Sequence, residues 1–521
     1  MKYTASSLSR AVSPTLLEDT WYLPTQKPSK ACLGRLAKMA SNRRFCRTAQ
    51  IRPINQSWLG VYAPLQSAYE RQRLESQVEP AWLRSLEPAI KRSLQFDWLI
   101  GEGTDPLAIV PRLDHAGFGY IISDEGLIAD TSHALRLFRL QGIKQLALLH
   151  DPVLRENNRE VGAMPFDHTR WLHVLTASAM ATLIIGNNPT LKPISNLIRV
   201  AALSHDALTP AGGDTTKLID PDLFDEDKHF PDLFELPDWP SLRDRYYLDE
   251  AELYQTIQGE GVAGQVLDVV DKLSYTNHDL YAYLGRSVVR FTERKELDSE
   301  SYSAGFFQIL DHATAHRNIC GVWDSVRIVG GDVVFSSPER LANFLKLRVM
   351  MFRQLYHNPV SRFLEYLVSK AITKAMFLDG FVTREELLTY GDAWLEGQID
   401  KYMGKNFCIP IYGWTGQYKL EHFPNEAAAL TEAIKFKADD RTMVLLDDFK
   451  SNVKSGADKF LVRRRGKTVT LREARPDLAE EMDELLVKKE GVFLIKASLK
   501  ELMMPKAMRL KLKRVAEPKS R

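Results

Sequence analysis

The sequence has little cysteine, no long apolar run and almost no net charge. Its 521 residues include four scattered cysteines that form no C-x-x-C pair: Cys32, Cys46, Cys320 and Cys408. This pattern indicates neither a disulfide framework nor a zinc ribbon, and it predicts a reducing, cytoplasmic location. The sequence contains no run of about 18 apolar residues, so it predicts no membrane span. Residues 1–20 lack the apolar segment of a secretory signal. A net charge of +2 gives no general argument for nucleic acid or membrane as a partner.

The length of 521 residues exceeds one ordinary hydrophobic core, so two or three domains are expected. The composition is that of a globular protein, with 45% hydrophobic and 26% charged residues. We expect an N-terminal extension of mixed helical character over 1–114, a core over 115–404 and a small α+β lobe over 405–521. The lobe ends in a basic tail, which is typical of a solvated terminus and less often of a nucleic-acid contact.

Local patterns along the chain predict a mainly α protein. Helical spacing of apolar residues predicts a helix starting near Thr169, a helix from the capping box at Thr383 towards Met403, and helices over 132–149, 195–208, 249–256, 263–284 and 337–377. Strands are predicted over 441–449, 459–462, 468–471 and 492–496, with a turn at 465–467. Residues 119–128 predict a hairpin, and residues 210–240, rich in Asp, Pro and Gly, predict a long functional loop.

Three short runs supply the side chains of a metal site. They are Thr169-Arg170-Trp171-Leu172-His173, Leu203-Ser204-His205-Asp206 and Asp271-Lys272-Leu273-Ser274-Tyr275. Imidazoles and carboxylates from separate helices can close on one divalent ion, which predicts His173, His205, Asp206 and Asp271 as its ligands. Taken singly, each also fits a structural role, such as a core histidine or a polar pair at a helix end. The ordered set favours the metal site, and such a cation would polarise a phosphoryl oxygen and acidify a bound water.

The order of these residues resembles that of the HD-domain phosphohydrolases, in particular the deoxynucleoside triphosphate triphosphohydrolases that include the bacterial dGTPases. The resemblance covers about residues 115–380 and rests on four motifs: Ile143-Lys144-Gln145-Leu146, Thr169-Arg170-x-x-His173, Asp271-Lys272-x-x-Tyr275-x-x-x-Asp279, and the segment from Arg348 to Pro359. It implies an HD-domain helical core, and together with the strands predicted after residue 405 this gives a mainly α fold with short hairpins and a small α+β C-terminal lobe.

The same resemblance implies which residues contact the substrate. They are Gln145, Arg170, Lys272, Tyr275, Asp279, Arg348 and Tyr356. Arg170 and Lys272 would hold phosphate oxygens through charge-assisted hydrogen bonds, and Gln145 would contact the sugar. Asp271, Tyr275 and Asp279 stand at i, i+4 and i+8, so they share one helix face. Each of three residues also has a structural alternative: Arg170 could be a capping or surface arginine, Lys272 an exposed helix lysine, and Gln145 a surface glutamine.

The chain departs from the family pattern just after the His-Asp doublet. Thr209 and Asp214 stand where the family places histidines near the phosphates. Threonine does not act as an acid or base near neutral pH as imidazole does, so the chemistry has moved to another residue or the substrate differs. His229 falls where the family carries another active-site histidine, which makes His229 and Asp214 the catalytic candidates, His229 as general acid. His229 also fits an exposed loop histidine.

These expectations combine into a function. We expect a divalent ion (Mn, Fe, Mg, Co or Zn) and hydrolysis of a deoxynucleoside triphosphate (dNTP) to the deoxynucleoside and triphosphate. The alternatives are an HD phosphohydrolase for another nucleotide or phosphate ester, a purely structural metal site, and a nucleotide- or single-strand-binding regulator with a degenerate site. The basic tail and Arg463-Arg464-Arg465 support the last of these. Expected partners are a nucleotide substrate and, by analogy with the family, further copies of the chain in a homo-oligomer.

Overall fold

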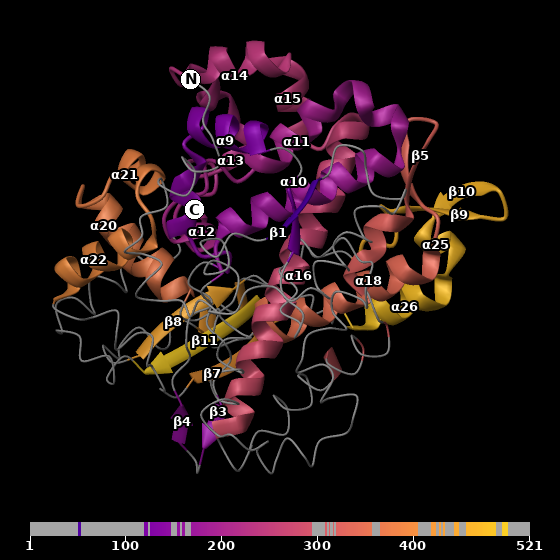
Figure 1. Cartoon of the computed structure of the whole chain (residues 1–521). Coiled ribbons are helices and arrows are strands. Elements are labelled where there is room, and N and C mark those ends of the chain that lie inside the picture. Colours follow the sequence, from indigo (N-terminus) through magenta and orange to yellow (C-terminus); the bar gives the residue numbers. More distant parts are fainter. Residues whose placement is uncertain are drawn as a thin grey trace, which may run out of the picture.

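A computed structural model describes most of the central part of the chain. It covers residues 125–146, 168–293, 319–356, 365–404 and 455–485, together with isolated positions between 308 and 316 and between 427 and 432. Seven strands lie outside these ranges: β1 (Gln50–Pro53), β2 (Gly119–Ile122), β3 (Leu154–Glu156), β4 (Arg159–Val161), β7 (Tyr418–Phe423), β8 (Thr442–Asp447) and β11 (Val492–Ser498). Most of the expected N-terminal extension and the basic tail lie outside the described residues. Helices dominate the described part, so the expected mainly α fold is confirmed (Figure 1).

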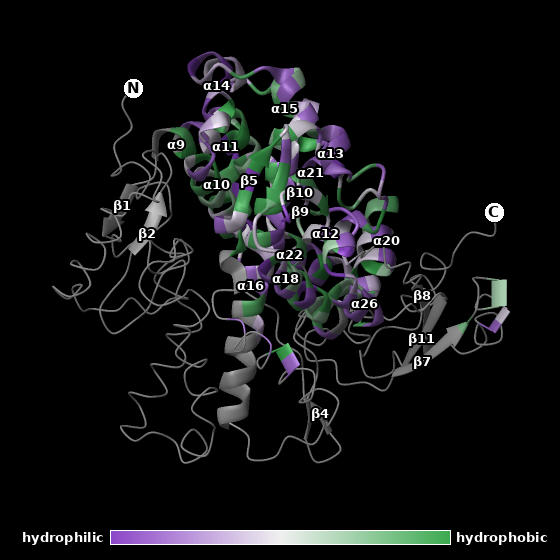
Figure 2. Cartoon of the chain, turned by 90° about the vertical axis from the view of Figure 1, so that its right-hand side faces the viewer, coloured by the Kyte–Doolittle hydropathy of each residue, from purple (hydrophilic) through white to green (hydrophobic). Residues whose placement is uncertain are grey.

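Three helices form the centre of the fold. α10 (Arg170–Asn187) packs against both α11 (Ser195–Ser204) and α16 (Gly261–Glu293), and α11 also contacts α16. α10 is buried throughout residues 170–185, and a helix buried on all sides needs partners on all sides. Figure 2 shows hydrophobic residues concentrated around α10 and α11. No helix among the described residues is long and apolar enough to span a membrane.

Shorter helices surround this centre. Those before α16 are α9 (Glu125–Ala134), α12 (Gly213–Lys217), α13 (Glu226–His229), α14 (Trp239–Tyr246) and α15 (Glu250–Ile257), with the 3₁₀ helices η2 (Leu137–Gly142), η3 (Pro189–Ile194) and η4 (Phe230–Glu235). Those after it are the 3₁₀ helix η5 (Ile319–Ser325), α18 (Pro338–Met351), the π-helical η6 (Phe352–Tyr356) and η7 (Leu367–Thr373), α20 (Lys374–Leu378), α21 (Arg384–Thr389), α22 (Asp392–Met403), α25 (Leu471–Ala474) and α26 (Pro476–Leu485). The helical pattern predicted over 337–377 is therefore divided among several elements.

A four-stranded sheet joins the helical core to residues from the C-terminal part of the chain. Its order is β10 (Lys467–Thr470), β9 (Leu461–Arg464), β6 (Asp332–Phe335) and β5 (Val326–Val329), with β6 and β9 parallel. The predicted turn between β9 and β10 is confirmed. Arg465 and Gly466 there have φ values of 48° and 81°, the left-handed pair that a two-residue hairpin loop requires. β7, β11 and β8 form a separate antiparallel sheet.

The hairpin predicted over 119–128 is wrong. β2 pairs with β1, far earlier in the chain, and Glu125 already begins α9. Leu127 and Ile128 are buried, with Thr131 and Ala134 following at helical spacing, so the helical pattern prevails over the turn signal. The single helix predicted over 132–149 is also wrong, because Arg136 adopts a left-handed conformation (φ 55°) that separates α9 from η2.

Two further expectations change in detail. Residues 210–240 contain α12, α13, η4 and the start of α14 rather than one long loop. The capping box at Thr383 is confirmed, but its helix ends at Thr389 and α22 follows after Gly391. Gly391 explains the interruption, since a Cβ there would lie 2.7 Å from the carbonyl oxygen of Gly142. The two backbones can approach only because residue 391 has no side chain.

Asp392 connects three segments of the fold, and its removal should destabilise them together. Its buried carboxylate accepts hydrogen bonds from the amides of Lys144 (2.8 Å) and Gly212 (2.7 Å). Each hydrogen bond to a charged group contributes about 1.5–3 kcal/mol, so Asp392→Ala is expected to lower the free energy of unfolding by about 3 kcal/mol or more. Urea unfolding followed by circular dichroism measures this. The control is Asp222→Ala, at a side chain 93% exposed, and equal losses in both variants would contradict the assignment.

Candidate metal centre

The four predicted metal ligands come together where three helices meet. His173 lies in the first turn of α10 and is 1% exposed. α11 ends immediately before His205, and the turn that follows presents His205 and the buried Asp206. Asp271 comes from α16, which packs against both other helices. Helix packing therefore converts residues from three separate parts of the sequence into one cluster.

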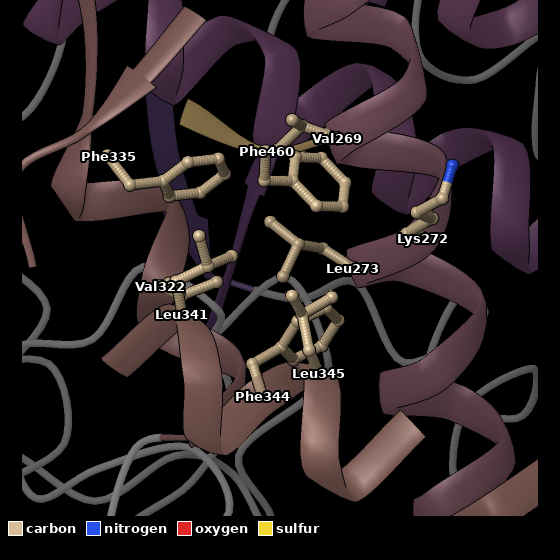
Figure 3. A pocket seen from close by; sticks show the side chains of 9 residues that line it. All are labelled: Val269, Lys272, Leu273, Val322, Phe335, Leu341, Phe344, Leu345 and Phe460. Carbon is tan, nitrogen blue, oxygen red and sulfur yellow. The ribbon is translucent and has the colours of Figure 1, made fainter. Parts of the chain in front are cut away.

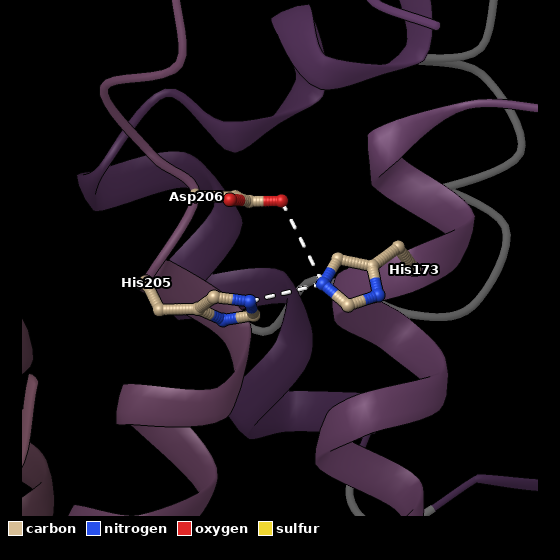
Figure 4. A group of neighbouring side chains, drawn as sticks. All are labelled: His173, His205 and Asp206. Carbon is tan, nitrogen blue, oxygen red and sulfur yellow. Dashed lines mark hydrogen bonds and ion pairs between the residues drawn. The ribbon is translucent and has the colours of Figure 1, made fainter. Parts of the chain in front are cut away.

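The ligand atoms of this cluster lie close together. The two imidazole Nε2 atoms of His173 and His205 are 3.0 Å apart, and His173 Nε2 lies 3.7 Å from Asp206 Oδ2 (Figure 4). Oδ1 of Asp271 lies 3.2 Å from His173 Nε2 and 3.5 Å from His205 Nε2. One ligand atom from each of His173, His205 and Asp206 falls within 4.8 Å of the other two, so these residues could hold a metal ion.

Hydrogen bonds fix the orientation of both imidazole rings. The Ser274 hydroxyl donates to the backbone oxygen of His173 (2.8 Å), so the same hydroxyl accepts from His173 Nδ1 (2.9 Å). His205 Nδ1 lies 3.1 Å from the carbonyl oxygen of Ala202, which can only accept. Both rings therefore carry hydrogen on Nδ1, and in their neutral forms both Nε2 atoms carry lone pairs. Two lone pairs that face each other at 3.0 Å require a proton or a cation between them.

The carboxylate of Asp206 is divided between two roles. Its Oδ1 accepts from Arg170 Nη1 at 2.8 Å, whereas its Oδ2 is buried without a hydrogen bond to any described residue. A buried carboxylate oxygen without a donor is costly unless a cation compensates it. Two oriented imidazoles and one uncompensated carboxylate oxygen thus form a donor set that fits a divalent metal ion.

The charges in the cluster raise the pKa of His205 and lower that of Asp271, so both groups favour their charged forms. Burial by itself would lower the pKa of His205, but Asp206 and Asp271 outweigh it and raise that pKa to about 9. Burial would raise the pKa of Asp271, and the hydrogen bonds from the two histidines instead hold it well below its usual value. Without a metal, the cluster consequently keeps a proton on His205 at neutral pH and both carboxylates ionised.

A group of alternating charges adjoins the metal cluster. Arg170, with its side chain 5% exposed, donates to Asp206 and, through Nη2, to Asp214 at 2.6 Å. Lys217 Nζ lies 2.9 Å from Asp214 and 2.5 Å from Glu226. Burial would lower the pKa of Arg170, but its two carboxylate partners outweigh that effect and raise it. The structure thus brings the predicted residues Arg170 and Asp214 into direct contact.

Glu226 is a site residue that the sequence reasoning missed. The fully buried hydroxyl of Thr209 donates to Glu226 Oε2 at 2.6 Å, beside the ion pair with Lys217. Glu226 and His229 belong to the same short helix, α13. His229 Nε2 lies 3.2 Å from the carbonyl oxygen of Asp222, and its Nδ1 lies 3.6 Å from Asp232. The acidic run at 225–227 was the only sequence signal for Glu226, and such runs also occur on solvated surfaces.

Two side chains of α16, Tyr275 and Asp279, contact two further predicted residues, Arg348 and Tyr356. Arg348 from α18 donates from Nε to the hydroxyl of Tyr275, and the Tyr356 hydroxyl donates to Asp279 Oδ2. His168 Nε2 lies 2.7 Å from the other oxygen of Asp279. Burial raises the pKa of Tyr275 to about 12, so this phenol stays protonated at neutral pH. The predicted sharing of one helix face by Asp271, Tyr275 and Asp279 therefore agrees with their contacts.

Gln145 is buried, and its backbone N–H donates to the backbone oxygen of His168 at 2.8 Å. Its side-chain oxygen has no hydrogen-bond partner among the described residues. A surface position for Gln145 is therefore excluded, since the residue is 8% exposed. A contact between this residue and a sugar remains a prediction.

Lys272 lies on a different face of α16. Its ammonium group forms an ion pair with Asp268, which also contacts Lys459 at 2.8 Å. In Figure 3 the side-chain nitrogen of Lys272 points away from the rings of a small apolar pocket. That pocket is lined by Val269, Lys272, Leu273, Val322, Phe335, Leu341, Phe344, Leu345 and Phe460. Among the described contacts none joins Lys272 to the metal ligands, so its role toward phosphate stays a prediction.

Comparison with known proteins leaves the family of this chain unassigned. No protein-family model and no curated protein matches it. A solved structure of a hypothetical protein from Aquifex aeolicus is 14% identical, with a TM-score of 0.49 over 77% of this chain and 97% of that one. A phosphohydrolase from Bacteroides thetaiotaomicron VPI-5482 is 15% identical, with a TM-score of 0.48 over 73% and 97%. At these values neither likeness carries an argument about this chain.

Ser274 orients a proposed metal ligand, so its removal should weaken metal binding. Loss of such a supporting hydrogen bond lowers metal affinity about 10–100-fold. We expect this loss of Mn²⁺ affinity in Ser274→Ala, measured by isothermal titration calorimetry. Ser178→Ala is the matched control, because the Ser178 hydroxyl is buried on α10 without a described hydrogen-bond partner. Unchanged affinity in Ser274→Ala would contradict the proposed orientation.

Metal binding should also release a proton. The pKa of His205 is raised to about 9 without metal, so protonation is favoured below that value and a metal must displace the proton at pH 7.5. Apparent Mn²⁺ affinity is expected to rise about tenfold per pH unit until the pH reaches that pKa. Calorimetry in two buffers with different ionisation enthalpies counts the released protons. A count of zero would show that His205 is not a ligand.

Proposed function

We propose that this protein is a metal-dependent phosphohydrolase. The observation that carries the proposal is the pair of imidazole Nε2 atoms 3.0 Å apart, with carboxylate oxygens of Asp206 and Asp271 at 3.2–3.7 Å. When bound there, a divalent ion would acidify a water molecule and polarise a phosphoryl oxygen. Imidazole and carboxylate ligands suit Mn, Fe, Co or Zn and, with water completing the shell, Mg.

The residues around the ligands would bind and neutralise phosphate. Arg170 contributes a permanent positive charge beside Asp206, and a guanidinium forms charge-assisted hydrogen bonds with phosphate oxygens. Tyr275 of α16 and Arg348 of α18, joined by a hydrogen bond, would add a phenol and a second guanidinium. Fixed donors of this kind stabilise charge that develops during phosphoryl transfer, which is the largest catalytic term in such sites.

Proton transfer requires a titratable group near the leaving oxygen. His229 and Asp214 are the candidates from the sequence, and Glu226 joins them because it contacts the buried Thr209 hydroxyl at 2.6 Å. Asp214 is held by Arg170 and Lys217, which favours its ionised form and disfavours it as an acid. Glu226 also forms an ion pair with Lys217, so its carboxylate could accept a proton through Thr209 but would not protonate the leaving oxygen, and His229 stays the candidate for the general acid.

The finer proposal is that the substrate is a dNTP, cleaved to a deoxynucleoside and triphosphate. Gln145, Asp279 and Tyr356 would then face the sugar. Asp279 is already engaged by His168 and Tyr356, so a sugar hydroxyl would have to replace one of them. A second candidate is another phosphate ester, which Thr209 favours because its hydroxyl, bonded to Glu226, stands where the family places a histidine near the phosphates. The domain division at 114 and 404 and a homo-oligomer are further proposals from the sequence.

Turnover and metal content should disappear together when a ligand is removed. Asp271→Asn keeps the side-chain size, and we expect its activity to fall more than about 100-fold, since loss of a mere supporting contact already costs 10–100-fold. The assay separates products by chromatography after incubation with each dNTP, each deoxynucleoside monophosphate or p-nitrophenyl phosphate and Mn²⁺. Bound metal is measured in parallel by mass spectrometry.

The matched control is Asp222→Asn, an identical change at a side chain that is 93% exposed. Triphosphate release from a dNTP would support the finer proposal, and release of orthophosphate from the esters would support the second candidate. An Asp271→Asn variant with full activity and full metal content would remove Asp271 from the centre. Absence of turnover on every phosphate ester would overturn the phosphohydrolase proposal.

A further inference from the structure

Asp214 is an exposed carboxylate that is held by two cations. It belongs to the first turn of α12, and its side chain is 59% exposed. It nevertheless lies 2.6 Å from Nη2 of the buried Arg170 and 2.9 Å from Nζ of Lys217. Solvent can therefore reach the outer side of this carboxylate, while its two oxygens are directed at cations beside the metal cluster.

Each cation would keep an anion if Asp214 moved away. Arg170 also donates to Asp206 at 2.8 Å, and Lys217 also contacts Glu226 at 2.5 Å. Rotation of the Asp214 side chain toward solvent would leave two cations and two carboxylates, so no buried charge would lose its last partner. Breaking a buried pair is costly mainly when an uncompensated charge remains, and this arrangement avoids that cost.

A phosphate group could supply the same negatively charged oxygens that Asp214 now presents to Arg170 and Lys217. Carboxylate and phosphate oxygens both accept charge-assisted hydrogen bonds from guanidinium and ammonium groups. Arg170 also keeps an unused donor, because its buried Nε makes no hydrogen bond with a described residue. Since Arg170 contacts Asp206, a phosphate bound here would lie next to the proposed metal ligands.

We propose that Arg170 and Lys217 form a phosphate subsite that Asp214 occupies in the absence of ligand, and that a substrate phosphate takes the place of this carboxylate. Asp214 is then an internal competitor for the subsite, and Lys217 is a phosphate-binding residue that the sequence analysis did not include. The identity of the ligand as a phosphate ester rests on the proposed function. The existence of the subsite rests on the contacts of these three residues.

Binding of inorganic phosphate to the full-length protein tests the subsite directly. The protein is treated with chelator, so the titration does not depend on metal or turnover. In Asp214→Asn the competing charge is removed, and orthophosphate is expected to bind about tenfold tighter or more than to the unaltered chain, because charge-assisted hydrogen bonds to the two cations become available to it. In Asp214→Asn the oxygen of the asparagine side chain can still accept a hydrogen bond from Arg170 and so compete with phosphate. Asp214→Ser, with a shorter side chain, is therefore a second variant.

Two controls make the result specific. Asp222→Asn removes an exposed carboxylate that lies 3.8 Å from Lys228, outside the subsite, and it should leave phosphate affinity unchanged. Lys217→Gln introduced together with Asp214→Asn should abolish the gain. Thermal melting confirms that each variant is folded. Equal phosphate affinity in the unaltered chain, Asp214→Asn and Asp214→Ser would overturn the proposal.

The outcome separates this proposal from the proposed function. Tighter phosphate binding in Asp214→Asn, combined with no turnover of any ester, would support the subsite and reject the phosphohydrolase. Unchanged phosphate binding, combined with metal-dependent turnover by the unaltered chain, would reject the subsite and leave the phosphohydrolase intact.

Discussion

Two imidazole nitrogens that face each other at 3.0 Å are the constraint on which the rest of the site depends. The hydrogen bonds of Ser274 and Ala202 direct a lone pair from each ring into the same small volume. Packing of α10 against α11 and α16 then prevents the rings from moving apart. Only a cation or a proton relieves this repulsion. The carboxylates of Asp206 and Asp271 supply the opposite charge, so the folded chain prepares a cation site at the expense of local stability.

The second feature of the site is its internal charge compensation. Arg170 and Lys217 alternate with Asp206, Asp214 and Glu226, and every one of these groups touches an opposite charge. Thr209, which stands where the resemblance places a histidine, extends the network through its hydroxyl rather than through an acid or base. The neutral side chain at position 209 therefore lies beside a glutamate and a lysine whose charges balance each other.

Local patterns predicted the mainly α fold and the residues that gather in the candidate metal cluster, because their signals lie within short runs. The order His173, His205-Asp206, Asp271 and the i, i+4, i+8 spacing on α16 need no knowledge of distant contacts. Long-range contacts explain what the sequence missed. β2 pairs with a strand far earlier in the chain, Ser274 meets His173 across 101 positions, and Glu226 meets Thr209 only after α13 folds back. The roles predicted for Lys272, Gln145 and His229 involve contacts with a bound substrate, so the contacts within the chain do not test them.

The central claim is that His173 and His205 bind one divalent ion together. Pulsed electron paramagnetic resonance of the Mn²⁺-loaded protein tests it most directly, because the spectrum counts the nitrogen nuclei coupled to the metal. Two coupled imidazole nitrogens are expected in the unaltered chain and one in His205→Ala. A spectrum of hydrated Mn²⁺ with no nitrogen coupling, at a metal content of one ion per chain, would contradict it.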